Sequence, residues 1–328
     1  MDQTLRTSAK SAPAAPGKRF LELIGHTPLL SLAQIEQEFP GVRLFAKAEW
    51  FNPGGSVKDR AALSIIADAE ASGRLHEGSV LLDATSGNTG VAYAMIAAAK
   101  GYRTTLCVPK NANPQVLSLM RAYGAELILT DPLQGSDGAI REARRLASEQ
   151  PDRFVYLDQY NNPANWKAHY RTTAVEIWEQ TQYTVTHFIA GLGTTGTFTG
   201  TSRRLKEFNP GIRMIAVQPD APFHGLEGLK HLESAIVPGI YDPFVHDEMV
   251  FISTDAAYDA VKHLAEQEGI LVGPSSGAAL AASLQLASQL VARAADAPSA
   301  IVMIFPDSGA RYVAEGLFAP LDDRSFSS

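Results

Sequence analysis

The sequence has almost no cysteine and no long apolar run. Cys107 is the one cysteine among 328 residues, so the chain can form no internal disulfide and no metal site built on several cysteines. No apolar run reaches the roughly 18 residues that a membrane-spanning helix needs, and the longest, residues 91–99, is closely followed by Gly101. We therefore expect a cytoplasmic protein with no partner in the membrane.

Charge is also scarce. Charged residues make up 19% of the chain and the net charge is −7. This balance argues against a nucleic acid or an anionic membrane as a partner held by charge, although a local positive site can still bind an anionic substrate. The eight histidines are scattered without the spacing of metal ligands, so we predict no metal site.

The remaining composition is that of an ordinary globular protein. Hydrophobic residues make up 45% of the chain, and its length suggests about two domains. Residues 1–19 are rich in Ser, Ala, Pro and basic residues and lack apolar periodicity, so we predict a disordered tail there.

After the tail, short apolar runs alternate with helical patterns. We predict strands over 43–49, 79–84, 104–108, 126–130, 154–157, 185–190, 212–217, 249–252 and 300–305. We predict helices over 59–72, 88–100, 114–123, 138–149, 166–180, 197–208, 255–268 and 277–295, with a long irregular stretch over 220–246. This alternation is typical of βαβ units and predicts an α/β fold with mainly parallel sheets. Several strands are apolar throughout, which indicates sheets covered by helices on both faces.

The stretch Asn52-Pro53-Gly54-Gly55-Ser56-Val57-Lys58-Asp59-Arg60 joins the first of these strands to a helix. Its first four residues favour a turn, and Ser56 with Asp59 fits a capping box. Lys58 in the first helical turn opposes the positive end of the helix dipole, which would lower its pKa. A neutral amine of this kind can form an imine with a carbonyl group. Taken alone, however, the stretch is explained equally well as a structural turn.

Ligands of parallel sheets bind beyond the carboxyl ends of the strands, where three further loops of small polar residues lie. Thr85-Ser86-Gly87-Asn88-Thr89-Gly90 opens a helix with more hydroxyls than capping requires, which suits a substrate carboxylate. Gly273-Pro274-Ser275-Ser276-Gly277-Ala278 also opens a helix, and simple capping by a serine explains it equally well.

The third loop, Gly191-Leu192-Gly193-Thr194-Thr195-Gly196-Thr197, matches G-x-G-x-x-G. A dinucleotide site, and with it an NAD-dependent oxidoreductase, is therefore an alternative. That fingerprint requires an acidic residue at the end of the next strand, where this chain has Gln218. The threonines suit a terminal phosphate, so we favour a site for a monophosphate.

Other polar residues have simpler interpretations. Cys107 is expected to be a small core residue of a strand. Arg141, Arg144 and Arg145 are expected to form a solvated helix face. The irregular stretch contains three cationic or titratable residues that can face a cleft, namely His224, Lys230 and His231.

Together, the four loops resemble the cysteine synthase family. These enzymes, also called O-acetylserine sulfhydrylases, are pyridoxal-phosphate (PLP) enzymes of fold type II. The resemblance runs over about residues 21–318. It implies the tryptophan synthase β-like fold: two three-layer α/β domains with PLP in the cleft between them. The implied domains are a smaller one over 52–162 and a larger one over 20–51 and 163–328. A homodimer is also implied.

The resemblance assigns roles to matching positions. Lys58 is the expected Schiff-base lysine and acid/base group, Asn88 the partner of the cofactor's ring oxygen, and Ser275 the partner of its ring nitrogen. The phosphate cup comprises Gly193, Thr194, Thr195, Gly196 and Thr197. The expected substrate-carboxylate groups are Thr85, Ser86, Gly87, Thr89 and Gln159.

Some positions depart from the A-type enzymes of the family. Thr195 replaces a glycine of the cup, Gly54-Gly55 replaces serines, and Pro274 replaces an aliphatic residue. The segments Arg171-Thr172-Thr173 and Glu176-Ile177-Trp178 resemble the B type more closely. The implied reaction is β-replacement through an aminoacrylate, forming L-cysteine from O-acetyl-L-serine or O-phosphoserine and sulfide or thiosulfate. A cystathionine β-synthase-like reaction or another β-replacement or β-elimination on the same fold is the alternative.

Overall fold

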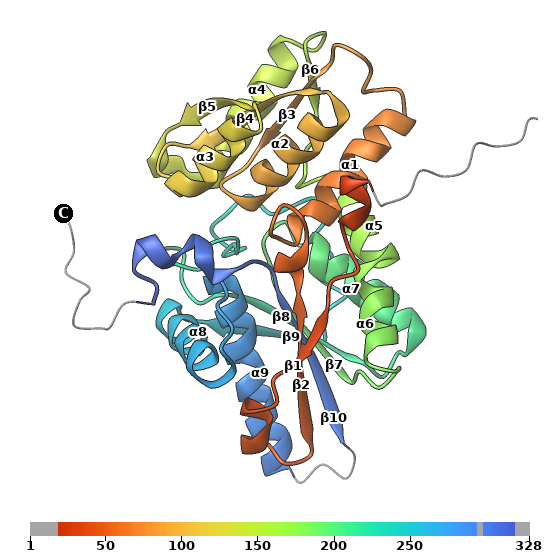
Figure 1. The fold of residues 1–328 in the computed structure, drawn as a ribbon, viewed down its shortest axis with the longest axis vertical. Helices are drawn as coiled ribbons and strands as arrows, with labels where there is room; N and C mark the ends of the chain where they lie inside the picture. The colour runs from red at the N-terminus through yellow and green to blue at the C-terminus, as the bar shows by residue number, and fades with distance from the viewer. Residues whose placement is uncertain (1–18, 294–297, 319–328) are drawn as a thin grey trace, which may run out of the picture.

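The computed structural model describes residues 19–293 and 298–318. The strands of this part form two sheets, which occupy the two ends of the elongated molecule (Figure 1). The predicted disordered tail over residues 1–19 lies outside the described residues, apart from its last residue, Arg19.

The larger sheet has six strands in the order β1-β2-β10-β7-β8-β9. All neighbouring pairs are parallel except β1 with β2. The strands are β1 (Leu29–Ser31), β2 (Val42–Ala48), β7 (His187–Gly191), β8 (Arg213–Pro219), β9 (Glu248–Ile252) and β10 (Ser299–Phe305). The first strands of the chain therefore share a sheet with its last one.

The smaller sheet is parallel throughout, with four strands in the order β5-β4-β3-β6. These strands are β3 (Val80–Ala84), β4 (Arg103–Pro109), β5 (Glu126–Thr130) and β6 (Phe154–Tyr156). The sheets thus divide the strands as the predicted domains do. This division supports the domain boundaries, which stay a prediction.

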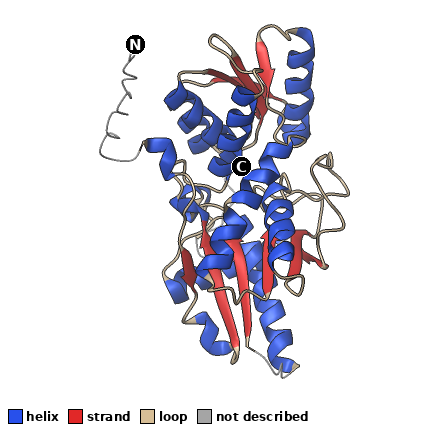
Figure 2. Ribbon diagram, turned by 90° about the vertical axis from the view of Figure 1, so that its right-hand side faces the viewer, coloured by secondary structure: helices blue, strands red, loops and turns tan. Residues whose placement is uncertain are grey.

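Helices cover both faces of each sheet. They are α1 (Lys58–Ala71), α2 (Asn88–Lys100), α3 (Pro114–Ala122), α4 (Gly135–Glu149), α5 (Pro163–Arg171), α6 (Thr173–Gln180), α7 (Gly196–Phe208), α8 (Thr254–Glu268) and α9 (Pro274–Ala292). Short 3-10 helices are η1 (Phe20–Leu23), η2 (Ile35–Glu38), η3 (Glu49–Phe51), η4 (Pro132–Gln134), η5 (Gly309–Arg311) and η6 (Val313–Glu315). Figure 2 shows the sheets with helices on either side.

The alternation of side chains along the central strands produces these layers. In β10, Ile301 and Met303 pack in the core cluster of α8 and α9, whereas Val302 and Ile304 pack in the cluster of α6 and α7. In the same way, Leu81 of β3 packs with α1, α2 and α3, while Leu82 packs with α4. Since successive side chains of a strand point to opposite faces, strands that are apolar throughout are buried between two helical layers. The predicted three-layer α/β architecture is confirmed.

Several details differ from the sequence-based prediction, and two of them have a clear physical reason. The helix expected over 166–180 is two helices, α5 and α6, because the backbone of Thr172 leaves the helical region at φ −123° and ψ −70°. Helix α9 begins at Pro274, three residues earlier than expected, and proline is well suited to the first position of a helix. The stretch 220–246 contains no helix or strand, as predicted.

None of the helices in the described ranges combines the length and the apolar character needed to cross a membrane.

Candidate active site

The predicted loops meet at two adjoining cavities. Lys58, Asn88, Gly193 and Thr194 line both of them. The first is also lined by Thr85, Ser86, Gly87, Thr89 and Gln159, and the second by Thr195, Thr197 and Ser275. Twelve of the thirteen predicted site residues therefore surround one region, where α1, α2, α7 and α9 begin. The exception is Gly196, which packs against the Asn165 side chain.

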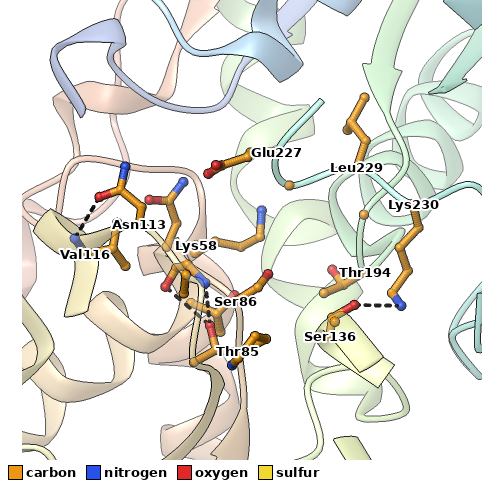
Figure 3. A pocket seen from close by; sticks show the side chains of 18 of the residues that line it. Lys58, Thr85, Ser86, Asn113, Val116, Ser136, Thr194, Glu227, Leu229 and Lys230 are labelled. Carbon is orange, nitrogen blue, oxygen red and sulfur yellow. Dashed lines mark hydrogen bonds between the residues drawn. The ribbon is translucent and has the colours of Figure 1, made fainter. Parts of the chain in front are cut away.

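Figure 3 shows how the cavity is built from two sides. Lys58 extends into it beside the turn of Thr85 and Ser86, which follows β3. Thr194, which follows β7, and Lys230 lie across from them. Since β3 and β7 belong to different sheets, the cavity lies between the two sheets.

Lys58 is the first residue of α1 and lies partly buried in the cavity wall. Loss of hydration lowers its pKa, and the nearby carboxylates of Asp307 and Glu49 oppose this shift. The direction agrees with the prediction, and desolvation by burial is the largest cause of the shift. A lowered pKa increases the fraction of the neutral, nucleophilic amine.

The predicted capping box is wrong. The residue before α1 is Val57, and no side chain caps the helix. Ser56 Oγ accepts only a long bond of 3.3 Å from the Lys58 N–H. The Asp59 side chain does not bond to Ser56; its Oδ2 accepts from the Gly54 N–H at 2.5 Å, because the turn folds back over the helix start.

Close packing explains the two glycines of this turn. A Cβ on Gly54 would overlap the Asp59 carboxylate, and a Cβ on Gly55 would lie 2.8 Å from Arg311 Nη2. Gly55 also has φ +78°, a conformation that side chains disfavour. Serines of the A-type pattern at these two positions would therefore require the Asp59 and Arg311 side chains to move.

The Thr85–Thr89 loop is fixed by hydrogen bonds. Thr85 Oγ1 accepts from the Gly87 and Gly90 N–H groups at 3.1 and 3.0 Å. Thr89 Oγ1 donates to Gln159 Oε1 at 2.8 Å, and Gln159 Nε2 donates to the Ala84 carbonyl at 2.6 Å. The loop and Gln159 are therefore coupled, and both line the cavity at the N-terminus of α2. Backbone N–H groups at such a terminus favour an anion.

Asp83 lies beneath this loop. It is fully buried and accepts from the Ala84 N–H at 2.7 Å and the Gln159 N–H at 3.1 Å. Burial raises its pKa to about 7, although these two bonds favour the ionised form. Asp83 thus joins the two segments predicted to hold a carboxylate.

The Gly193–Thr197 loop is fixed mainly by close packing. A Cβ on Gly193 would overlap the Gly228 carbonyl oxygen, and a Cβ on Gly196 would overlap Asn165 Oδ1. Asn165 Nδ2 also donates to Thr194 Oγ1 at 3.2 Å. Thr195 has φ +69°, a left-handed conformation that is unusual for a β-branched residue.

These features fit a phosphate group. Thr195 Oγ1 is buried and has no hydrogen-bond partner among the described residues. It lies at the N-terminus of α7, where backbone N–H groups favour an anion. Thr197 Oγ1 lies 3.3 Å from His169 Nε2, and burial lowers the pKa of His169 to about 3, which keeps this ring neutral.

Sequence reasoning missed Asp307 and Arg311. Both follow β10, and both hydrogen-bond to the side chain of Asn88. The rule that located the other loops applies here too, because a polar segment, 307–311, follows an apolar strand of a parallel sheet. Asn113, Glu227 and Tyr312 also line the first cavity and were not predicted.

A second missed feature is a buried charge network behind Lys58. The Arg60 guanidinium donates to Glu49 at 2.7 Å and to Glu176 at 2.6 Å, and Lys47 lies 2.7 Å from Glu176. Attraction to these cations holds the pKa of Glu176 down to about 2 despite burial. The network connects the first turn of α1 to β2 and α6.

Three residues of the irregular stretch were candidates for facing a cleft. Two of them, His224 and Lys230, line the first cavity, whereas His231 does not. Lys230 Nζ lies 2.9 Å from Asp137 Oδ1 of α4 and 5.2 Å from the centre of the Tyr160 ring.

Four residues with a predicted structural or surface role are placed as expected. Cys107 is buried, and burial raises its pKa to about 12. Arg141, Arg144 and Arg145 are exposed. Within the described ranges, no group of three or more His, Cys, Asp or Glu side chains could hold a metal ion.

The site brings a lysine together with a glycine- and threonine-rich loop at a helix N-terminus, an arrangement typical of an enzyme that uses a phosphorylated cofactor. A family model described as "Pyridoxal-phosphate dependent enzyme" matches residues 20–307. The chain belongs to this family, and its cofactor is pyridoxal phosphate. The dinucleotide alternative is wrong. In keeping with this, Gln218 is buried and accepts from the Leu232 N–H at 3.0 Å.

Characterised relatives cover nearly the whole chain. A cysteine synthase of Aquifex aeolicus is 51% identical over 92% of this chain and 92% of its own length. Cysteine synthase B of Salmonella typhimurium is 45% identical over 90% of this chain and 95% of its own length. These matches confirm the resemblance to cysteine synthases, including B-type ones.

Solved structures agree. The cysteine synthase of Entamoeba histolytica superposes with a TM-score of 0.85 and 35% identity, covering 95% of this chain and 94% of that chain. The fold-type II assignment is therefore confirmed.

Proposed function

We propose that this enzyme forms L-cysteine by β-replacement, with O-acetyl-L-serine or O-phosphoserine as the amino-acid substrate and sulfide or thiosulfate as the sulfur donor. The observation that carries the proposal is the meeting of Lys58, the Thr85–Thr89 loop and the Gly193–Thr197 loop at one cavity. An amine, a carboxylate site and a phosphate site are what an amino-acid β-replacement on PLP requires.

PLP, when bound, delocalises the negative charge left at the Cα of its amino-acid partner. Lys58 is proposed to hold the cofactor at rest, to take the Cα proton and to return it to the product. Thr194, Thr195 and Thr197 with Gly193 and Gly196 would hold the phosphate, and Asn88 and Ser275 would contact the ring.

The substrate carboxylate is proposed to bind Thr85, Ser86, Gly87, Thr89 and Gln159. The bonds that couple Thr89, Gln159 and Ala84 support this role, because they hold the loop in one shape before substrate arrives. A pre-formed site reduces the entropy lost on binding.

The first test is Lys58→Ala. Wild-type protein should show a visible absorbance band of the bound cofactor. Borohydride treatment should then link the cofactor covalently to Lys58. The variant should lose this covalent fixation and at least about 1,000-fold of its turnover, since it lacks both the amine and the acid/base group. Covalent fixation at another lysine would contradict the proposed role.

The second test fixes the substrates. O-acetylserine, O-phosphoserine and serine are each supplied with sulfide, with thiosulfate and with homocysteine, and amino-acid products are identified by mass spectrometry. We expect turnover with O-acetylserine or O-phosphoserine. If serine with homocysteine were the productive pair, the enzyme would be cystathionine β-synthase-like. Pyruvate release without a sulfur product would indicate β-elimination.

From the resemblance we also propose a homodimer in the cytoplasm. Light scattering at several protein concentrations tests the first statement, because a stable dimer keeps twice the mass of the 35.2 kDa chain upon dilution.

A further inference from the structure

We propose that Asp307 and Arg311 are positioning residues that set the orientation of the Asn88 side-chain amide toward the cofactor. This inference rests on the proposed contact between Asn88 and PLP. It assigns a function to two residues at the end of β10, far in sequence from α2.

The two ends of the Asn88 side-chain amide bind different residues of the segment after β10. Its Nδ2 donates to Asp307 Oδ2 at 2.6 Å. Its Oδ1 accepts from Arg311 Nη1. Asn88 itself lines both cavities beside Lys58.

This pair of partners permits one orientation of the amide. The oxygen and nitrogen of an asparagine amide have almost the same shape, so hydrogen-bond partners decide which way it points. A guanidinium group can only donate, and Asp307 Oδ2 acts as an acceptor because the Tyr312 hydroxyl also donates to it, at 2.7 Å. A flipped amide would place oxygen against oxygen and donor against donor.

The fixed orientation leaves one Nδ2 hydrogen for another acceptor. An amide nitrogen carries two hydrogens, and Asp307 takes one of them. The second is available for an oxygen of a ligand in the cavity. The arrangement therefore presents a donor, and not an acceptor, where the ring oxygen of PLP is expected.

Both positioning residues are themselves held firmly. Asp307 is buried and forms an isolated β-bridge with Ser56, two residues before Lys58. A Cβ on Gly273 would overlap Asp307 Oδ1, so the carboxylate packs directly against the start of α9. Arg311 Nη2 donates to the Gly54 carbonyl at 2.5 Å. One short segment thus contacts the starts of α1, α2 and α9.

The test is a double-mutant cycle on PLP affinity, measured by equilibrium dialysis of protein stripped of cofactor. Asp307→Ala and Arg311→Met should each weaken PLP binding about tenfold, since each leaves a polar end of the amide without its partner. In an Asn88→Ala background, the same substitutions should change PLP affinity less than about twofold, because the group they orient is gone.

The cycle separates positioning from general structural support. Asp307→Asn, which keeps an oxygen acceptor, should retain most of the affinity, and the melting temperature of each cofactor-free variant checks folding. Equal losses of affinity with and without the Asn88 side chain would overturn the proposal, as would unchanged affinity in both single variants. If Asp307→Ala does not fold, Arg311→Met alone decides the outcome.

Failure here is distinct from failure of the proposed function. A protein that binds PLP and makes cysteine but shows additive losses retains the proposed function and refutes this inference. A protein that binds PLP with the predicted coupling but makes no cysteine refutes only the proposed reaction.

Discussion

The two sides of the cavity are held in shape by different means. On the side of the six-stranded sheet, the Gly193–Thr197 loop is fixed by packing so close that Gly193 and Gly196 have no space for a Cβ. On the side of the four-stranded sheet, the Thr85–Thr89 loop is fixed by hydrogen bonds that involve Gln159 and the buried carboxyl of Asp83.

Because the two loops are held by different interactions, we expect them to respond differently to changes in side-chain volume and in pH. A packed loop is sensitive to volume and almost insensitive to pH, because the His169 ring that contacts Thr197 has its pKa lowered to about 3 and stays neutral. A loop supported by a buried carboxyl tolerates small changes in volume but depends on protonation. The predictions below test this contrast.

The largest effect is expected from Asp83→Asn. In the folded protein the carboxyl keeps its proton up to about pH 7, whereas in the unfolded chain it loses it near pH 4. Between these values the folded state binds more protons, so this group's contribution to the free energy of unfolding falls as pH rises. Replacing Asp83 by Asn removes this pH dependence of the free energy of unfolding, whose slope reaches about 1.4 kcal/mol per pH unit.

Urea unfolding of both proteins at pH 5 and pH 7 measures this effect. The stability of the variant relative to the wild type should be higher at pH 7 than at pH 5 by roughly 2 to 3 kcal/mol. Asp59, whose pKa burial also raises to about 7, is present in both proteins and cancels from the comparison. A difference that does not change with pH would mean that Asp83 is not the group that titrates.

The next effect is expected from Gly193→Ala. A methyl group there must displace the backbone of Gly228, and such overpacking costs about 1 to 3 kcal/mol. PLP affinity should fall about 10- to 100-fold, as measured by dialysis. Gly87→Ala is the matched control on the opposite side, since a Cβ there meets no atom within 4 Å. Equal losses in the two variants would refute the contrast between the two sides.

A smaller effect is expected from Thr195→Gly. Glycine adopts the left-handed conformation of this position without strain, but it loses more backbone entropy on folding, so stability should change by less than about 1 kcal/mol. Loss of the buried hydroxyl should still weaken PLP binding about threefold to tenfold. Thr195→Ser keeps the hydroxyl and should keep the affinity; a loss of affinity in Thr195→Ser would assign the effect to the backbone.

The smallest effect is expected at Cys107, which lies in β4 with its thiol buried and its pKa raised to about 12. A thiol in this state is unreactive because the thiolate is the reactive form. At pH 8 we expect almost no reaction with a thiol reagent in native protein and complete reaction in urea. Labelling of native protein within seconds would show that the smaller sheet opens readily.

Much of the fold followed from local sequence. The boundaries of α2 and β5 were predicted to the residue, because apolar periodicity, Gly101 and the flanking polar loops define them. The helix expected over 166–180 was wrong, because the chain leaves the helical conformation at Thr172, whose hydroxyl donates to the Ala168 carbonyl and accepts from Arg60 of another helix. The contact with Arg60 joins residues 112 positions apart, so local periodicity cannot reveal it.

The site was predicted from the rule that ligands bind beyond the ends of parallel strands, and that rule gathered the four loops correctly. We applied this rule only to loops rich in glycine and hydroxyl groups. It therefore did not identify the segment 307–311, which contains an acidic and a basic residue. Both residues bind the Asn88 amide, and Asn88 is 219 positions from Asp307 and 223 positions from Arg311 in the sequence.

The sequence by itself determined most of the strands and helices and the four loops of small polar residues, because each depends on residues that are neighbours along the chain. The tertiary structure decided the pKa of Asp83 and Lys58 and the orientation of the Asn88 amide. Burial and partners from distant segments set these properties, and both exist only after the two sheets have packed against their helices.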